Sequence, residues 1–256
     1  EWVLNGQKVW TSGAHFADYG MVVARSDPSA LKHKGLTYFF LDMKTPGVEA
    51  KPIKQISGSA NFNEVFFNDV RIPDSQRLGA EGDGWKVALT TLMNERLAVG
   101  DPPGLDFDQI FEATKEIEVE DGLAIKNSEV RQKMADWYVQ SRGLQYTKYR
   151  SMTALSKGQT PGPELSISKL VTASKMQEVS SYALDLMDMA GYVHHDKNPV
   201  MRNLFQNGYF FSAAMRIAGG TDEVLRNIIA ERVLGLPQDE RPDKKVPFNE
   251  LPSGKN

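Results

Sequence analysis

Glu95 is the residue whose place in the sequence pattern most directly suggests chemistry. It falls at helical spacing on an apolar stripe with Trp85, Ala88, Leu92 and Val99. A carboxylate in such a position is costly to bury unless it is paired or protonated. Two interpretations stay open. Glu95 is either one half of an ion pair between helices, or a general base made more basic by the loss of water.

A second candidate is the segment Gly219-Gly220-Thr221, which lies between two helical patterns. Paired glycines permit a close approach of backbone to ligand, and Thr221 followed by Asp222 is able to cap the next helix. The free amide groups at such a helix start suit a phosphate or another anion. A plain turn between two helices accounts for the same residues, so this motif alone decides nothing.

The third candidate is Trp10-Thr11-Ser12, where a strand pattern runs into small and hydroxyl residues. An indole beside a hydroxyl group is suited to stack on a planar ring and donate a hydrogen bond to it. A tryptophan at the edge of a strand that simply packs into the core is the alternative.

Several kinds of site are excluded or disfavoured. The chain has no Cys, which rules out disulfides, thiol nucleophiles and thiolate metal ligands. It also lacks the Gly-x-Gly-x-x-Gly and Gly-x-Ser-x-Gly motifs. His194-His195-Asp196 are neighbours in sequence that do not converge on one ion at helical spacing, so we expect no metal site.

Composition limits the class of protein. With 41% hydrophobic and 25% charged residues, the 256-residue chain has the makeup of an ordinary globular protein. Its 30 basic and 33 acidic residues give a net charge of −3, which provides no field that would attract nucleic acid. The longest apolar stretches, such as 35–41, are far shorter than the roughly 20 residues that span a bilayer, so we expect no membrane span.

The elements that must position these candidates fall into two halves. Residues 1–78 read as β-structure, in which Asn5-Gly6 predicts a hairpin turn between two short strands. Turn residues separate the further strands that we expect, which are 19–25, 35–43, 48–56 and 63–71.

The second half, 79–236, is helical. Apolar periodicity predicts helices at about 128–156, 163–190, 199–217 and 221–234, and their short connections favour an antiparallel four-helix bundle. Residues 237–256 are polar and contain four prolines, which predicts a flexible tail. The expected fold class is α+β, an antiparallel sheet or partial β-barrel followed by the bundle.

Taken in order, these segments resemble the acyl-CoA dehydrogenase family of flavoproteins, from residue 1 to about 236. The segments that carry the resemblance are LNGQKVWTSG (4–13), VAR (23–25), GLTYF (35–39), PGV (46–48), FNEVFFNDVRIP (62–73), NER (94–96), GGT (219–221) and AER (230–232). The family has an N-terminal helical domain, a middle β-domain and a C-terminal bundle. The resemblance therefore implies a fragment that begins partway through the β-domain.

The resemblance also assigns roles to individual residues. It implies FAD as the cofactor, with Trp10 beside the flavin ring, Ser12 donating a hydrogen bond to flavin N5, and Thr11 between them in the same cofactor-binding segment. Thr221 and Glu223 resemble the pair near the phosphate and adenosine part of FAD. The stretch 185–191 matches a segment that a neighbouring subunit contributes, but the glycines of relatives are replaced by Met187-Asp188-Met189-Ala190 before Gly191.

The catalytic base is where relatives differ. Many members place a Glu directly before the Gly-Thr pair, but this chain has Gly219 there. Other members place the base on the first long helix of the bundle, which is where Glu95 lies. The resemblance therefore favours Glu95 as the base, and Arg96 beside it is expected to contact the substrate.

The implied reaction is α,β-dehydrogenation of an acyl-CoA, with electrons passed to an electron-transfer flavoprotein. The expected assembly is a homodimer or homotetramer, or else a heterotetramer, and the expected location is the cytoplasm of a bacterium or the mitochondrial matrix of a eukaryote. Two alternatives remain. One is a non-catalytic subunit or inactive fragment of a heteromeric enzyme, and the other is an oxidase of the same fold.

Overall fold

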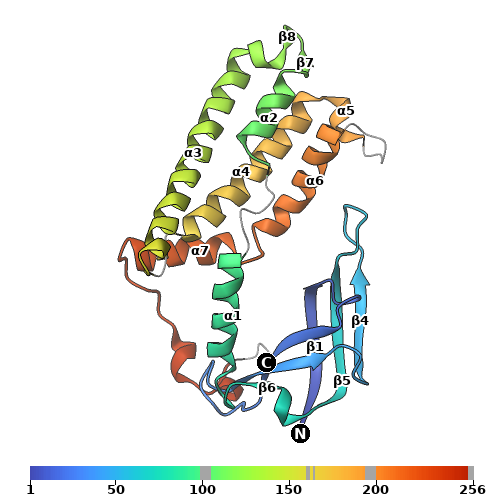
Figure 1. The fold of residues 1–256 in the computed structure, drawn as a ribbon, viewed down its shortest axis with the longest axis vertical. Helices are drawn as coiled ribbons and strands as arrows, with labels where there is room; N and C mark the ends of the chain where they lie inside the picture. Colours follow the sequence, from blue (N-terminus) through green and yellow to red (C-terminus); the bar gives the residue numbers. More distant parts are fainter. Residues whose placement is uncertain (99–104, 160–161, 164, 194–199, 253–256) are drawn as a thin grey trace. The chain divides into compact units, whose positions relative to one another are not determined.

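The computed structural model describes residues 1–98, 105–159, 162–163, 165–193 and 200–252, with all their side chains except those of 93–98, 165, 200 and 242. The chain forms two compact units (Figure 1). The first comprises residues 1–100 and 239–256, and the second comprises residues 101–238. The predicted α+β class is confirmed, and the described strands form open antiparallel sheets rather than a closed barrel.

The first unit is built on two three-stranded sheets. One has the order β1-β5-β4, with β1 at Trp2–Ser12, β5 at Phe62–Ile72 and β4 at Val48–Ile53. The other has the order β2-β3-β6, with β2 at Tyr19–Arg25, β3 at Leu36–Asp42 and β6 at Arg77–Leu78. Alternate residues of these strands are buried and form one core, which includes Val22, Phe39, Leu41, Val65, Phe67, Val70 and Ile72.

The predicted hairpin at Asn5-Gly6 is wrong. These residues lie inside the continuous strand β1, at a shift in its pairing with β5 between Leu4 and Gly6. Gly6 has φ 142°, and the Asn5 side chain accepts a hydrogen bond from the backbone N–H of Asp69 at 2.8 Å. A residue pair that tolerates positive φ serves a bulge as well as a turn, and here the long partner strand β5 selects the bulge.

Helix α1 (Gly84–Ala98) belongs to the first unit, in contact with β2 and β3. Ala88 of this helix is buried, and the Trp85 ring stacks on His33 with ring centroids 4.3 Å apart. Gly84 is necessary at the helix start, because a Cβ there would lie 2.6 Å from the Thr37 backbone. The contacts therefore group α1 with the sheets rather than with the helices that follow it.

The C-terminal segment also packs on the first unit. It contains two short helices, η4 (Pro242–Lys245) and η5 (Phe248–Glu250). The Arg25 guanidinium lies 3.7 Å from the centre of the Phe248 ring, and Lys32 forms an ion pair with Asp243. The described part of the expected flexible tail thus makes specific contacts.

The second unit is a helical bundle. Its longer helices are α2 (Phe107–Thr114), α3 (Ser128–Ser156), α4 (Leu165–Leu186) and α6 (Val200–Met215), joined by the short β7 (Glu118–Val119), β8 (Gly122–Leu123) and α5 (Met189–Tyr192). After α6 come α7 (Asp222–Ile228) and a π-helical turn η3 (Ile229–Val233). The predicted stripe on α4 is buried at Met176, Val179 and Ala183, where it meets Trp137 of α3 and Phe205 of α6.

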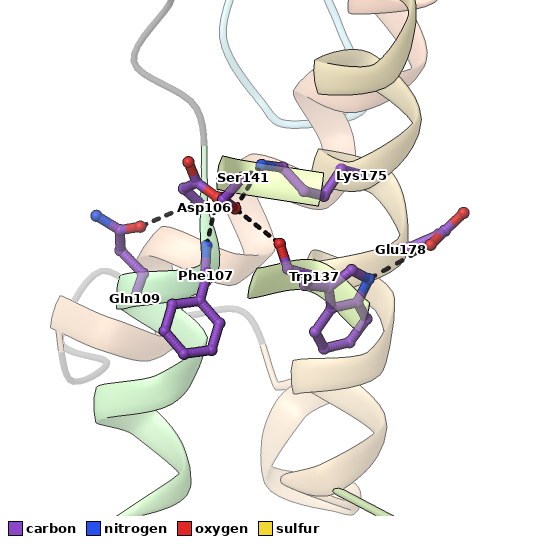
Figure 2. A network of polar contacts seen from close by, with 7 residues as sticks. All are labelled: Asp106, Phe107, Gln109, Trp137, Ser141, Lys175 and Glu178. Atoms are coloured by element: carbon purple, nitrogen blue, oxygen red, sulfur yellow. Dashed lines mark hydrogen bonds and ion pairs between the residues drawn. The ribbon is translucent and has the colours of Figure 1, made fainter. Parts of the chain in front are cut away.

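A buried lysine lies among these helices (Figure 2). The Lys175 side chain on α4 is 1% exposed, and its Nζ donates to Asp106 Oδ1 at 2.6 Å and to Ser141 Oγ at 2.8 Å. Asp106 caps the start of α2, where its Oδ1 accepts from the Phe107 N–H at 2.6 Å. Burial disfavours the charged carboxylate, but the hydrogen bonds from Lys175 and Ser141 outweigh burial and lower the pKa of Asp106.

Candidate functional site

The first group of candidate residues lies on a bulge at the end of β1. Strand β1 forms one edge of its sheet, and its pairing with β5 is shifted between Lys8 and Thr11. Trp10, inside this bulge, has φ 60°, a value that a bulky residue rarely adopts. Bulges at sheet edges commonly re-aim a side chain, and here the re-aimed side chain is an indole.

The bulge exposes the residues that stacking on a planar ring requires. Trp10 is 62% exposed, which argues against the interpretation that it is simply a core residue. Among the described residues its one aromatic neighbour is Phe62, which it meets edge to face with ring centroids 6.1 Å apart. The side chain of Ser12 is exposed and makes no hydrogen bond to any residue that the structure describes, and Thr11 is half-buried.

A polar pair that sequence reasoning missed supports this bulge. Asn63 of β5 is fully buried, and its Nδ2 donates to the Thr11 carbonyl at 2.9 Å. Its Oδ1 lies 2.9 Å from His15 Nδ1. The sequence did contain a sign of this pair. Asn63 alternates with Val65 and Phe67 on the inward face of its strand, and a buried amide there needs hydrogen-bond partners.

The second group lies at the turn between α6 and α7. Gly219 and Gly220 have φ of 67° and 104°, so both use conformations that favour glycine. Thr221 caps α7, as predicted, because its side chain accepts from the Val224 N–H at 3.2 Å. Glu223 is exposed in the first turn of the same helix.

Two basic side chains meet the buried Asp222 and hold this turn. Asp222 is 2% exposed and accepts from Arg216 Nε at 2.7 Å. Lys169 Nζ donates to the Gly220 carbonyl at 2.6 Å and lies 3.8 Å from Asp222 Oδ1. Burial lowers the pKa of Lys169, and the attraction of Asp222 opposes that shift. Asp222 therefore has an internal structural role, while Thr221 is half-buried and Glu223 is exposed.

Glu95 and Arg96 lie in the last turns of α1, and their side chains fall outside the described residues. His194-His195-Asp196 also fall outside them. Elsewhere in the described chain, no three His, Asp or Glu side chains gather in a way that could hold a metal ion. None of the helices in that part of the chain is long and apolar enough to cross a membrane.

The structure thus brings Trp10, Thr11 and Ser12 together in the first unit, and Thr221 and Glu223 together in the second. In the stretch 185–191, Asp188 has φ 49°, and Gly191, which lies inside α5, is buried. A Cβ at Gly191 would lie 2.3 Å from the Leu184 carbonyl oxygen. Gly191, the one glycine of this stretch, is therefore required for packing within the chain.

Comparison with known proteins matches most of the chain to two family models, and the boundary between them lies before α1 rather than after it. The family model for the acyl-CoA dehydrogenase middle domain matches residues 1–70, and the model for the C-terminal domain matches residues 82–234. The chain belongs to the acyl-CoA dehydrogenase family. The resemblance seen in the sequence segments is thereby confirmed.

Individual family members agree over most of this chain. It is 38% identical to the acyl-CoA dehydrogenase IpdE1 of Mycolicibacterium smegmatis over 93% of its length, which corresponds to 58% of that protein. It is 36% identical to the acyl-CoA dehydrogenase FadE34 of Mycobacterium tuberculosis over 93% of its length, which corresponds to 32% of FadE34. The chain therefore spans about a third to three fifths of these two relatives.

A solved structure shows the same fold. The Tcur3481-Tcur3483 steroid acyl-CoA dehydrogenase matches with a TM-score of 0.78 at 22% identity. The match covers 93% of this chain and 61% of that one. At this level of identity the likeness concerns the fold alone.

Proposed function

We propose that this acyl-CoA dehydrogenase family chain takes part in the FAD-dependent α,β-dehydrogenation of an acyl-CoA thioester to the trans-2-enoyl-CoA. The observation that carries the proposal is the bulge of β1 just before Ser12, in a strand that leaves both the Trp10 ring and the Ser12 side chain exposed in a chain of this family. Both groups are of the kind that a flavin ring contacts.

The residues present fit a flavin. The Trp10 indole is mostly exposed and touches Phe62 edge to face, which leaves ring surface available for stacking. The Ser12 hydroxyl has no hydrogen-bond partner in the part of the chain that the structure describes, so it can donate to a ring nitrogen. Thr221 and Glu223 are proposed to contact the adenosine and phosphate part, with Thr11 in the backbone segment next to the ring. FAD, when bound, supplies the acceptor for the hydride that leaves the substrate β-carbon.

Glu95 is proposed as the base that takes the α-proton, with Arg96 as a substrate contact. The turn between α6 and α7 supports this choice, because Gly219 occupies the position from which many relatives supply the carboxylate. Without a side chain, Gly219 accepts no proton. A Glu on α1 is then the remaining candidate that the sequence pattern singles out.

The electron acceptor and the assembly belong to the same proposal. The reduced cofactor passes its electrons to an electron-transfer flavoprotein, and the protein assembles as a homodimer or homotetramer, or as a heterotetramer with an unlike subunit. The cofactor then lies at an interface between subunits.

A non-catalytic subunit of a heteromeric enzyme is the second candidate, and Gly219 is the observation that favours it. If Glu95 is only an ion-pair partner, then neither of the two family positions supplies a base. This candidate predicts that the protein binds a flavin or a partner subunit without reducing the flavin itself.

The test is a titration of the purified protein with FAD, followed by anaerobic mixing with acyl-CoA thioesters of different chain length and branching. Loss of the visible flavin absorbance with at least one thioester is the expected result. Bound flavin that no thioester reduces would favour the non-catalytic subunit, and a protein that does not bind FAD would contradict the proposal.

A further inference from the structure

The conformation of Trp10 needs support from outside the strand. Its positive φ is sparsely populated by bulky residues, so such a conformation persists only where surrounding contacts hold it. Regular pairing with β5 is interrupted between Lys8 and Thr11, so the ladder itself provides no restraint at Trp10. Side chains must supply that restraint.

Asn63 makes the contact that the interrupted ladder lacks. Its Nδ2 donates to the carbonyl of Thr11, the residue that directly follows Trp10, at 2.9 Å. Asn63 is 0% exposed, so water cannot replace this bond. Pairing resumes immediately afterwards, with Thr11 opposite Asn63 and Ser12 opposite Phe62. The amide thus fixes the bulge at the point where it rejoins the sheet.

His15 fixes the orientation of that amide. Because Asn63 Nδ2 faces a carbonyl, Asn63 Oδ1 must face His15, and an oxygen there can only accept. His15 Nδ1 therefore carries a proton and donates to Asn63 Oδ1 over 2.9 Å. The His15 side chain itself is exposed, and its ring meets Phe16 edge to face with centroids 4.8 Å apart.

We propose that Asn63, oriented by His15, is a positioning residue that holds the β1 bulge in the conformation presenting Trp10 and Ser12 to a planar cofactor. The part of this inference that concerns flavin rests on the proposed function. The part that concerns the conformation of Trp10 stands on the hydrogen bonds alone.

The other bulge of β1 provides a matched control. Asn5 also connects β1 to β5 through its side-chain amide, which bonds to Asp69 through its Nδ2 at 3.0 Å and to the Asp69 N–H through its Oδ1 at 2.8 Å. Asn5 is exposed, and it lies at the shift between Leu4 and Gly6, away from Trp10. If any loosening of β1 were enough to disturb Trp10, Asn5→Ala and Asn63→Ala would have the same effect on it.

The experiment uses the flavin-free protein labelled with 5-fluorotryptophan. The chain has four Trp residues, so Trp10→Phe identifies the Trp10 fluorine resonance. We expect Asn63→Ala to shift or broaden that resonance and to leave those of Trp2, Trp85 and Trp137 unchanged. His15→Ala is expected to produce a smaller change of the same kind, and His15→Gln, which keeps an N–H donor, is expected to restore the wild-type spectrum.

FAD affinity is measured on the same variants. Asn63→Ala is expected to weaken binding about tenfold, roughly the size of one buried hydrogen bond, while Asn5→Ala leaves it unchanged. If Asn63→Ala does not fold, His15→Ala gives the same test from an exposed position. A Trp10 resonance that is unchanged in both variants overturns the proposal, as does an equal loss of affinity in Asn5→Ala.

The same experiments distinguish failure of the proposed function from failure of the positioning by Asn63. If the wild-type protein does not bind FAD, the flavin part of this inference is overturned together with the proposed function. The Trp10 resonance in the flavin-free variants then confirms or overturns the positioning by Asn63 by itself.

Discussion

Replacing Lys175 by Met tests the energetic role of the buried lysine in the second unit. Met has a similar length and keeps the apolar packing of the Lys stem, but it donates no hydrogen bond. Asp106 Oδ1 and Ser141 Oγ then both lose the donor that reaches them from α4 (Figure 2). The main effect of Lys175→Met is therefore a carboxylate without its counter-charge.

The expected loss of stability in Lys175→Met follows from how deeply Lys175 and Asp106 are buried. Removing one member of a fully buried ion pair costs about 3 to 5 kcal/mol. The Asp106 side chain is 48% exposed, so water compensates for part of the lost charge, and its bond from the Phe107 N–H remains. We expect the free energy of unfolding of this unit to fall by about 2 to 3 kcal/mol. The midpoint of thermal unfolding should fall by roughly 5 to 10 °C.

The assay is urea unfolding followed by the helical circular dichroism signal. Lys133→Met, at an exposed position of α3, is the control and should change stability by less than about 0.5 kcal/mol. Adding Asp106→Asn to Lys175→Met should recover part of the loss, because Asn still caps α2 and leaves no unpaired charge. If Lys175→Met is as stable as the Lys133 control, or if the double variant is the least stable, the reasoning is wrong.

Three further predictions concern pH, glycine positions and the alternative base. The pKa of Asp106 is lowered in the folded state. The ionised carboxylate therefore stabilises the fold fully at pH values above the pKa of an unfolded Asp, about 4, and this stabilisation is lost as the pH falls. The stability difference between wild type and Lys175→Met should therefore shrink below about pH 4 in acid unfolding curves. Gly191→Ala should lower the midpoint of thermal unfolding, because its Cβ would lie 2.3 Å from a carbonyl oxygen. Gly143→Ala on α3 has open space around its Cβ, so it should raise the midpoint, with a gain in the free energy of unfolding of about 0.5 to 1 kcal/mol. Gly219→Glu, introduced into Glu95→Gln, should restore only part of the rate of flavin reduction, because the Cβ meets nothing within 4 Å but φ is +67°. Full recovery, or no change at all, would contradict this last expectation.

Most of the fold follows from local patterns. The strands β2 to β5 and the helices α3, α4 and α6 lie where alternation, apolar periodicity and breakers such as Pro46-Gly47 place them. The hairpin prediction was wrong because Asn5-Gly6 is compatible with a bulge as well as with a turn, and only pairing with the partner strand β5 decides between them. Local residue types define what a backbone tolerates, and distant pairing selects among the tolerated conformations.

The site was predictable to a smaller degree. Trp10 and Ser12 could be named from their types, but the 62% exposure of Trp10 depends on the bulge. Asn63 and His15 are 48 positions apart, and Lys175 and Asp106 are 69 apart. Such contacts between distant segments leave little trace in a single sequence, apart from a polar residue on an otherwise apolar face.

The central claim is that Glu95 removes the α-proton of an acyl-CoA. The most direct measurement is the single-turnover rate of flavin reduction under anaerobic conditions, with a saturating acyl-CoA, in wild type, Glu95→Gln and the exposed control Glu112→Gln. Gln keeps the size and hydrogen bonding of Glu but is not basic. We predict that Glu95→Gln still binds the thioester while reduction slows by about 10²- to 10⁴-fold, and that the control is unchanged. Reduction of the Glu95→Gln flavin at a rate close to that of wild type would contradict the assignment and leave Glu95 as a structural residue.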